Sequence, residues 1–204
     1  MLSNRSSAPR RLALVFAPIA LLAAPCLAQN HVLRLSAIGD YVAVPDSSSL
    51  SPSGSFTIEG WMRVLGGTAN PRLVGKGYGC EGGSVELVAL NSTGTLTFDF
   101  PWRVAKESSG GPCDLVGVTS TPNDQSWVHL ALVADAATGE IRLYRNGQFE
   151  ASSVWAPNGW NGAEMRIGRN THNCCDPDQL FGDIDGVRFW NVARTGAELR
   201  CTAN

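Results

Sequence analysis

The sequence predicts an all-β fold, either a sandwich or a barrel of antiparallel strands. Short runs that alternate apolar and polar residues recur about every 10–15 residues, and Gly, Pro, Asn, Asp or Ser bounds each of them. The chain is also rich in Gly, Ser, Thr, Asn and Val, and few long helical patterns occur. Strands do not alternate with helices, which disfavours a parallel α/β sheet.

The predicted strands follow one another along the whole chain after its N-terminal segment. Each has the two-residue period of a strand with one face buried. The runs cover residues 31–37, 40–45, 55–64, 72–76, 84–90, 94–100, 126–134, 139–147, 163–169 and 181–190.

Two hairpins are predicted from local sequence. Residues 84–90 and 94–100 are joined by a short polar turn, so we expect them to pair. Asn146 and Gly147 form the strongest short hairpin signal, because both central residues of this turn need a positive φ.

The remaining connections are predicted as loops and one terminal helix. Residues 101–125 and 150–162 are expected to be long loops. Thr195 and Glu198 form a capping box, which predicts a helix of one to two turns ending near Arg200.

Residues 1–28 are predicted to be a secretory signal peptide. Three arginines without any acid precede an apolar run from Leu12 to about Ala24, and small residues precede the expected cleavage after Ala28. The apolar run is too short for a membrane span. We therefore expect a secreted chain, extracellular, periplasmic or at the cell surface, whose residues 29–204 form one domain.

The charge balance excludes some partners. The formal net charge is −2, and removal of the three arginines of the leader lowers it to −5. No basic cluster remains after residue 28, so we expect neither nucleic acid nor an anionic membrane as a partner.

Five cysteines remain after the leader, and export predicts that they form disulfides. The ends of the 84–100 hairpin would bring Cys80 near Cys113. Cys174 or Cys175 with Cys201 would tie a loop to the terminal helix. A strained Cys174–Cys175 bond and unpaired thiols remain open, and the odd number leaves one cysteine without a partner in the chain.

Six segments follow one another over residues 32–200: LRLSAIGDYVAVPDSSSL, SFTIEGWMRV, RLVGKG, SWVHLALVADAATGEIRLYRNGQ, MRIGRN and LFGDIDGVRFWNVARTGAELR. Together, and in this order, they resemble a laminin-G-like domain of the concanavalin A-like jelly-roll class. The resemblance implies a jelly roll of two antiparallel sheets, with Trp61, Trp127 and Trp190 in the core. It implies little about function, because the fold hosts lectins, adhesion modules, enzymes and interaction domains.

The segment LFGDIDGVRFW raises a specific question. If it is one regular strand, Asp183 and Asp185 share a face with Val187 and Phe189, an unfavourable place for a carboxylate without compensation. Gly186 stands where the family usually has Glu, and the family varies at Asp183. The resemblance therefore implies no role that needs both acids.

Calcium is one explanation for these acids. Carboxylates are the hard oxygen ligands that Ca²⁺ prefers, and Asp40 could join Asp183 and Asp185 if the first and last strands are neighbours. A second supply is the loop with Asp176 and Asp178. The alternatives stay open: Asp185 as a buried acceptor of backbone N–H groups, and the loop acids as solvated residues.

Ligand recognition by the loops is a further hypothesis. Trp102, Trp155 and Trp160 fall outside the segments that resemble the family, and sugars stack on aromatic faces while amides and charged groups read their hydroxyls. The alternative is that these tryptophans anchor loops or belong to the core. The predicted ligand-binding residues are Trp102, Arg103, Trp155, Asn158, Trp160 and Asn161.

The sequence does not favour catalysis. Glycoside hydrolases of this sandwich need two closely spaced acids, but Glu59 is alone on its strand. No G-x-S-x-G elbow accompanies His129, which is interpreted as a structural residue. We therefore expect a non-catalytic module that binds an extracellular or cell-envelope glycan or protein. An adhesion or interaction domain without a sugar site is the first alternative, and a glycoside hydrolase is the second.

Overall fold

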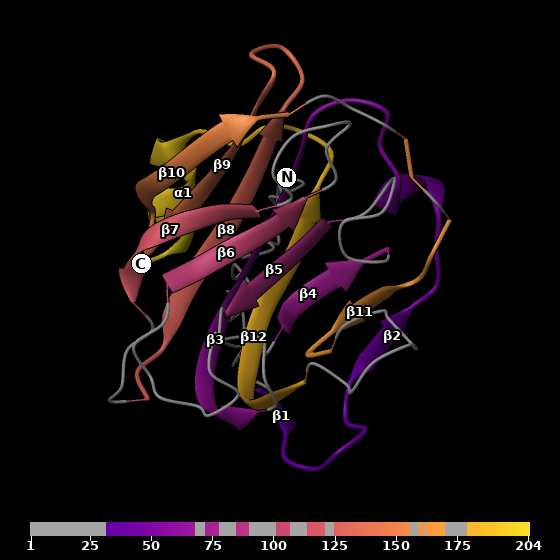
Figure 1. Ribbon diagram of the computed structural model, residues 1–204, viewed down its shortest axis with the longest axis vertical. Helices are drawn as coiled ribbons and strands as arrows, with labels where there is room; N and C mark the ends of the chain where they lie inside the picture. The colour runs from indigo at the N-terminus through magenta and orange to yellow at the C-terminus, as the bar shows by residue number, and fades with distance from the viewer. Residues whose placement is uncertain are drawn as a thin grey trace, which may run out of the picture. The chain divides into compact units, whose positions relative to one another are not determined.

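The computed structural model describes residues 32–67, 72–77, 85–89, 101–106, 114–120, 125–155, 159–160, 162–169 and 179–204. They form two antiparallel sheets (Figure 1), with a short 3-10 turn η1 (Ser48–Leu50) and a helix α1 (Gly196–Thr202). Sheet A has the order β1 (Leu33–Leu35), β12 (Leu180–Trp190), β3 (Phe56–Gly67), β8 (Val128–Asp135), β9 (Glu140–Arg145) and β10 (Gln148–Val154). Sheet B has the order β2 (Val42–Val44), β11 (Met165–Ile167), β4 (Arg72–Lys76), β5 (Val85–Ala89), β6 (Pro101–Lys106) and β7 (Asp114–Ser120).

The two sheets pack face to face, as predicted for a jelly-roll sandwich. In Figure 1 the strands of sheet B pass in front of β3 and β12 of sheet A. Phe56, Ile58 and Met62 of β3 share one core with Leu73 and Val74 of β4, and each is at most 2% exposed. Burial of such a side chain contributes about 1.5–3 kcal/mol, so the alternation of β3 fixes which face turns inward.

The other residues of β3 lie on the opposite face of sheet A, which we call the outer face. It carries Glu59, Trp61 and Arg63 from β3 and their cross-strand neighbours from β12 and β8. The same alternation in β8 places Leu130 and Leu132 in the core. The outer face of sheet A is therefore rich in charged and aromatic side chains.

A β-bulge at Gly186 changes the expected faces of β12. Between Asp185, opposite Trp61, and Arg188, opposite Glu59, the strand holds one residue more than its partner. Gly186 has a φ of +58°, the left-handed conformation that glycine adopts at such bulges. Ile184 before the bulge lies in the core and Asp183 and Asp185 on the outer face, whereas Val187 and Phe189 after it pack against the core. The prediction that all four side chains share one face was wrong.

Two expectations about connections also need correction. Residues 101–125 contain β6 and β7 instead of forming one long loop, and β10 occupies the start of the predicted loop 150–162. β6 and β10 each hold one β-branched residue, Val104 and Val154, so their strand signal is weak. The predicted hairpin partner of residues 84–90 is wrong as well, because β4 and β6 occupy both edges of β5. Residues 94–100 lie outside the described residues.

The predicted turn and helix are confirmed. Asn146 and Gly147 join β9 to β10 with φ values of +48° and +71°. Thr195 Oγ1 accepts the backbone N–H of Glu198, and the Glu198 carboxylate accepts the backbone N–H of Thr195, which completes the capping box. The helix ends at Thr202, two residues later than expected.

Cys201 is a free and exposed thiol, so its predicted bond to Cys174 or Cys175 is wrong. The helix turns Leu199 toward sheet A, and Cys201 lies two residues further, about 200° around the axis. Cys80, Cys113, Cys174 and Cys175 lie outside the described residues, as does the predicted signal peptide. In the described part of the chain no helix is long and apolar enough to cross a membrane.

Candidate functional site

Helix α1 covers one half of the outer face of sheet A. Leu199, fully buried, packs on Ala131, Val133 and Tyr144 of strands β8 and β9. This contact leaves the other half of the outer face, where β1, β12, β3 and β8 lie side by side, without a covering element among the described residues.

Glu59 is buried where the covered half begins. Its Oε1 accepts hydrogen bonds from Trp190 Nε1 at 2.8 Å and Arg194 Nη1 at 2.6 Å, and its Oε2 accepts one from Thr202 Oγ1 at 3.0 Å. His129 Nε2 lies 3.3 Å from Oε2. Because the donors come from the end of β12, from the connection that follows it and from α1, the carboxylate ties the C-terminal segment to β3.

The donors around Glu59 decide its protonation. Burial alone raises the pKa of this carboxyl, but His129, Trp190, Thr202 and the charge of Arg194 outweigh it and lower the pKa from 4.5 to about 2. A buried carboxylate that stays ionised at this pKa and accepts three hydrogen bonds is poorly suited to act as a general acid. The chemistry of Glu59 is therefore that of a structural acceptor.

Two tryptophans and one acid line a pocket of about 330 Å³ in the exposed half of the outer face. They are Trp61, Trp127 and Asp185. Trp61 contacts the ring of His129 edge-on at 5.3 Å between centroids, and the Arg63 guanidinium lies 5.4 Å from the Trp127 ring centroid. We call the pocket lined by Trp61, Trp127 and Asp185 the tryptophan pocket. It combines two indole walls with a carboxylate that can accept hydrogen bonds.

Asp185 is held in this pocket by the bulge. Its Oδ1 accepts the backbone N–H of Gly186 at 2.7 Å, which leaves Oδ2 without a described partner. The expectation that Asp185 accepts backbone N–H groups is therefore met by one donor, although its side chain is half-buried rather than buried.

Asp183 lies one cross-strand row further along the outer face, between two arginines. Arg34 Nε and Nη2 donate to its two oxygens at 2.7 and 2.9 Å, and Arg63 Nε donates at 2.9 Å. The hydrogen bonds from Arg34 are the largest cause of the lowered pKa of Asp183. Together with the hydrogen bonds from Arg63, they outweigh burial, which raises this pKa. Asp183 is thus compensated by two cations, which answers how a buried carboxylate is tolerated there.

The three residues predicted to hold calcium each accept hydrogen bonds from other groups of the protein. Asp40 Oδ2 accepts the backbone N–H groups of Ser36 and Ala37, whose hydrogen bonds lower its pKa. The described residues contain no group of three or more His, Cys, Asp or Glu side chains that could hold a metal ion. Asp176 and Asp178 lie outside them. Calcium at Asp40, Asp183 and Asp185 remains a prediction, which the melting temperature with and without chelator can check.

Trp155 and Trp160, the two predicted loop tryptophans whose side chains the structure describes, lie away from the outer face. Trp155 and Trp160 both pack edge-on against Phe56, at 5.7 and 5.2 Å between centroids, and border the core. Trp160 Nε1 donates to the carbonyl of Pro52 at 2.8 Å. Trp102 and Arg103 belong to β6, opposite Ala89 and Val88, and their side chains are outside the described part. Asn158 and Asn161 are also outside it, so the structure brings only Trp155 and Trp160 together.

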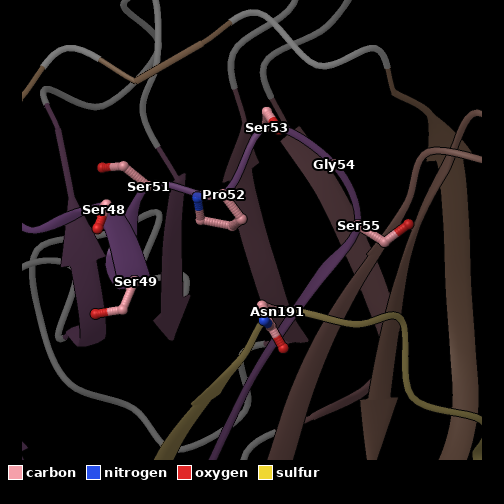
Figure 2. Close-up of a pocket in the computed structure, with 8 residues that line it drawn as sticks. All are labelled: Ser48, Ser49, Ser51, Pro52, Ser53, Gly54, Ser55 and Asn191. Atoms are coloured by element: carbon pink, nitrogen blue, oxygen red, sulfur yellow. The ribbon is translucent and has the colours of Figure 1, made fainter.

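A second pocket, of about 420 Å³, is lined by the serine-rich segment before β3 (Figure 2). Figure 2 shows its serines spread from η1 to the start of β3, with Asn191 coming from the chain after β12. Ser51 Oγ donates to Asp46, and Ser55 Oγ accepts the backbone N–H of Ala136. These hydroxyls hold the loop, and the described residues that line this pocket include no aromatic or charged side chain.

Sequence reasoning missed the tryptophan pocket because it assigned Trp61, Trp127 and Trp190 to the core. The structure corrects this: Trp61 and Trp127 are half-buried on the outer face, and Trp190 is 36% exposed. A signal was present in the alternation of residues 56–63, since Trp61 has the same parity as Glu59 and Arg63.

Comparison with known proteins supports the fold. A sequence profile of the Concanavalin A-like lectin/glucanases superfamily, the Laminin_G_3 domain, matches residues 36–200. No curated protein matches the chain.

Three solved structures illustrate the similarity. A Bacteroides ovatus protein provisionally described as carbohydrate binding shares 26% identity at a TM-score of 0.60, over 78% of this chain, which spans 43% of that protein. The CBM40 of the Ruminococcus gnavus IT-sialidase shares 13% identity at a TM-score of 0.65, covering 86% of this chain and 97% of its own. Domain 4 of AbnA, an extracellular arabinanase of Geobacillus stearothermophilus solved with arabinotriose, shares 16% identity at a TM-score of 0.59, covering 86% and 82%.

Proposed function

The chain belongs to the Concanavalin A-like lectin/glucanases superfamily, and from this premise we propose that it is a secreted, non-catalytic module that binds a glycan in the tryptophan pocket. The observation that carries the proposal is the exposed half of the outer face, where Trp61, Trp127 and Asp185 line one pocket.

The chemistry of the pocket suits a sugar. The C–H faces of a pyranose ring stack on indole rings, and its hydroxyls donate to carboxylate oxygens. Asp185 Oδ2 is free to accept such a donor. The relatives with glycans in their structures, a CBM40 with sialyllactose and an arabinanase domain with arabinotriose, support the glycan class.

The proposal assigns no reaction to the site. Glu59 is occupied by hydrogen bonds from the C-terminal segment, and Asp183 is occupied by Arg34 and Arg63. Among the described residues of this part of the outer face, Asp185 is therefore the one acid with an oxygen available to a ligand. Hydrolysis of a glycosidic bond ordinarily needs two acids.

A glycan array followed by calorimetry tests the proposal. We expect Trp127→Ala to weaken binding of any glycan that the wild type retains by about tenfold or more, because it removes one stacking wall. Phe149→Ala is the matched control, since Phe149 is an aromatic residue 56% exposed on β10. A wild type that binds no glycan, or a Trp127→Ala variant that binds as well as the control, would contradict the proposal.

A further inference from the structure

Arg34 and Arg63, beside the tryptophan pocket, have N–H groups that make no hydrogen bond to a described residue. Arg34, Asp183 and Arg63 form one cross-strand row on β1, β12 and β3. The Asp183 side chain is 1% exposed, whereas those of Arg34 and Arg63 are 60% and 32% exposed. One buried carboxylate thus holds two guanidinium groups that still reach solvent.

The unused donors can be assigned atom by atom. A guanidinium has five N–H groups, and Asp183 engages Nε and Nη2 of each arginine. Neither Nη1 has a hydrogen bond to a described residue. Since the row holds two positive charges and one negative charge, a second anion bound by both arginines would balance its charge.

This row adjoins the tryptophan pocket. Arg63 contacts the ring of Trp127, and Asp183 is separated from Asp185 by one residue on the same face, about 7 Å along the strand. Hydrogen-bond donors and the acceptor therefore lie in neighbouring rows of the exposed half. The arginines supply the donors in one row, and Asp185 supplies the acceptor in the next. A ligand that carries an anionic group and hydroxyls on one ring matches both ends.

We propose that the glycan bound by this face is acidic, with a sugar carboxylate or sulfate held by Nη1 of Arg34 and Arg63. The sugar ring lies against Trp61 and Trp127, and its hydroxyls donate to Asp185. This inference rests on the proposed function, since it names the class of glycan for the same site. Asp183 acts as a positioning residue that fixes both guanidinium groups before the ligand arrives.

Paired polymers test the inference by separating charge from shape. The probes are a uronic acid polymer and its carboxyl-reduced form, and a sulfated polysaccharide and its desulfated form. We expect the wild type to bind at least one acidic polymer about tenfold or more tightly than its neutral form, and increasing salt to weaken only the acidic interaction. The pair that shows the difference identifies which anion is bound.

Variants connect the effect to the arginine row. Arg34 is largely exposed, so Arg34→Gln is expected to fold, and it should remove most of the preference for the acidic polymer. Arg34→Lys should restore part of it. Arg200→Gln is the control, because it makes the same charge change at an exposed position of α1.

The outcomes distinguish the two proposals. Equal binding of acidic and neutral polymers, unaffected by Arg34→Gln but lost in Trp127→Ala, would overturn the acidic class and leave the glycan site standing. Absence of binding to every polymer and to the glycan array would overturn the proposed function, and this inference with it.

Discussion

Replacement of Glu59 by Gln removes a buried charge that fastens the C-terminal segment to β3. The side chain is fully buried and accepts hydrogen bonds from Trp190, Arg194 and Thr202. Gln keeps the volume but replaces one acceptor oxygen with a donor that faces other donors. The variant should therefore keep its fold and lose stability.

The magnitude follows from the protonation of Glu59. Its pKa falls from 4.5 to about 2 on folding, so the ionised carboxylate stabilises the folded state by roughly 3 kcal/mol at neutral pH. For a domain of this size that corresponds to a loss of roughly 6–12 °C in melting temperature. Glu140→Gln on β9, where the side chain is 46% exposed, should change stability by less than about 0.5 kcal/mol and serves as the control.

The pH dependence gives the decisive signature. Because the folded-state pKa is depressed, the stabilisation is complete above about pH 4.5 and is lost as the pH falls toward 2. Urea unfolding of wild type and Glu59→Gln should differ by the full amount at pH 7, and the difference should shrink between pH 4.5 and 2. Equal stability at pH 7, or a difference that does not narrow in acid, would refute the assignment of Glu59 as the anchor of the C-terminal segment.

Two further substitutions test the supports of the outer face. Leu199→Ala should lower the free energy of unfolding in urea by about 2–5 kcal/mol, because Leu199 is fully buried against Ala131, Val133 and Tyr144. The control Leu199→Met should lower it by less than about 1.5 kcal/mol. A loss near zero for the Ala variant would mean that α1 does not pack there. Gly186→Ala should cost about 1–2 kcal/mol, because a residue with a Cβ must adopt a φ of +58° at the bulge; Gly54→Ala, which meets no atom within 4 Å of the new Cβ, is the control, and equal melting of the two variants would contradict a strained bulge.

The two-residue period of the strands predicted the sandwich but not the bulge in β12. Alternation of apolar residues placed Phe56, Ile58 and Met62 in the core because burial of each face is a local property of the strand. Gly186 shifts the alternation of β12 by one residue, and one glycine inside a strand does not by itself reveal a bulge. The faces of Val187 and Phe189 could therefore be known only from the pairing with β3.

The candidate site depended on contacts between distant parts of the chain. Arg34 and Asp183 are 149 residues apart, and their pairing follows from β1 lying beside β12. The sequence indicated that Asp183 and Asp185 belong to one face, but not that two arginines flank Asp183. Trp61 and Trp127 were assigned to the core by resemblance, although the parity of β3 put Trp61 beside Glu59 and Arg63.

We expect a glycan to bind at Trp61 and Trp127 and not at Trp102, Trp155 or Trp160. A nitrogen–proton correlation spectrum of the uniformly labelled protein can follow one indole N–H signal for each of its six tryptophans, assigned by single Trp→Phe variants. On titration with a glycan that the array identifies, the signals of Trp61 and Trp127 should shift, while that of Trp160, hydrogen bonded to Pro52, should stay unchanged. Shifts of the Trp102, Trp155 or Trp160 signals, with those of Trp61 and Trp127 unchanged, would place the ligand outside the tryptophan pocket and contradict the proposed site.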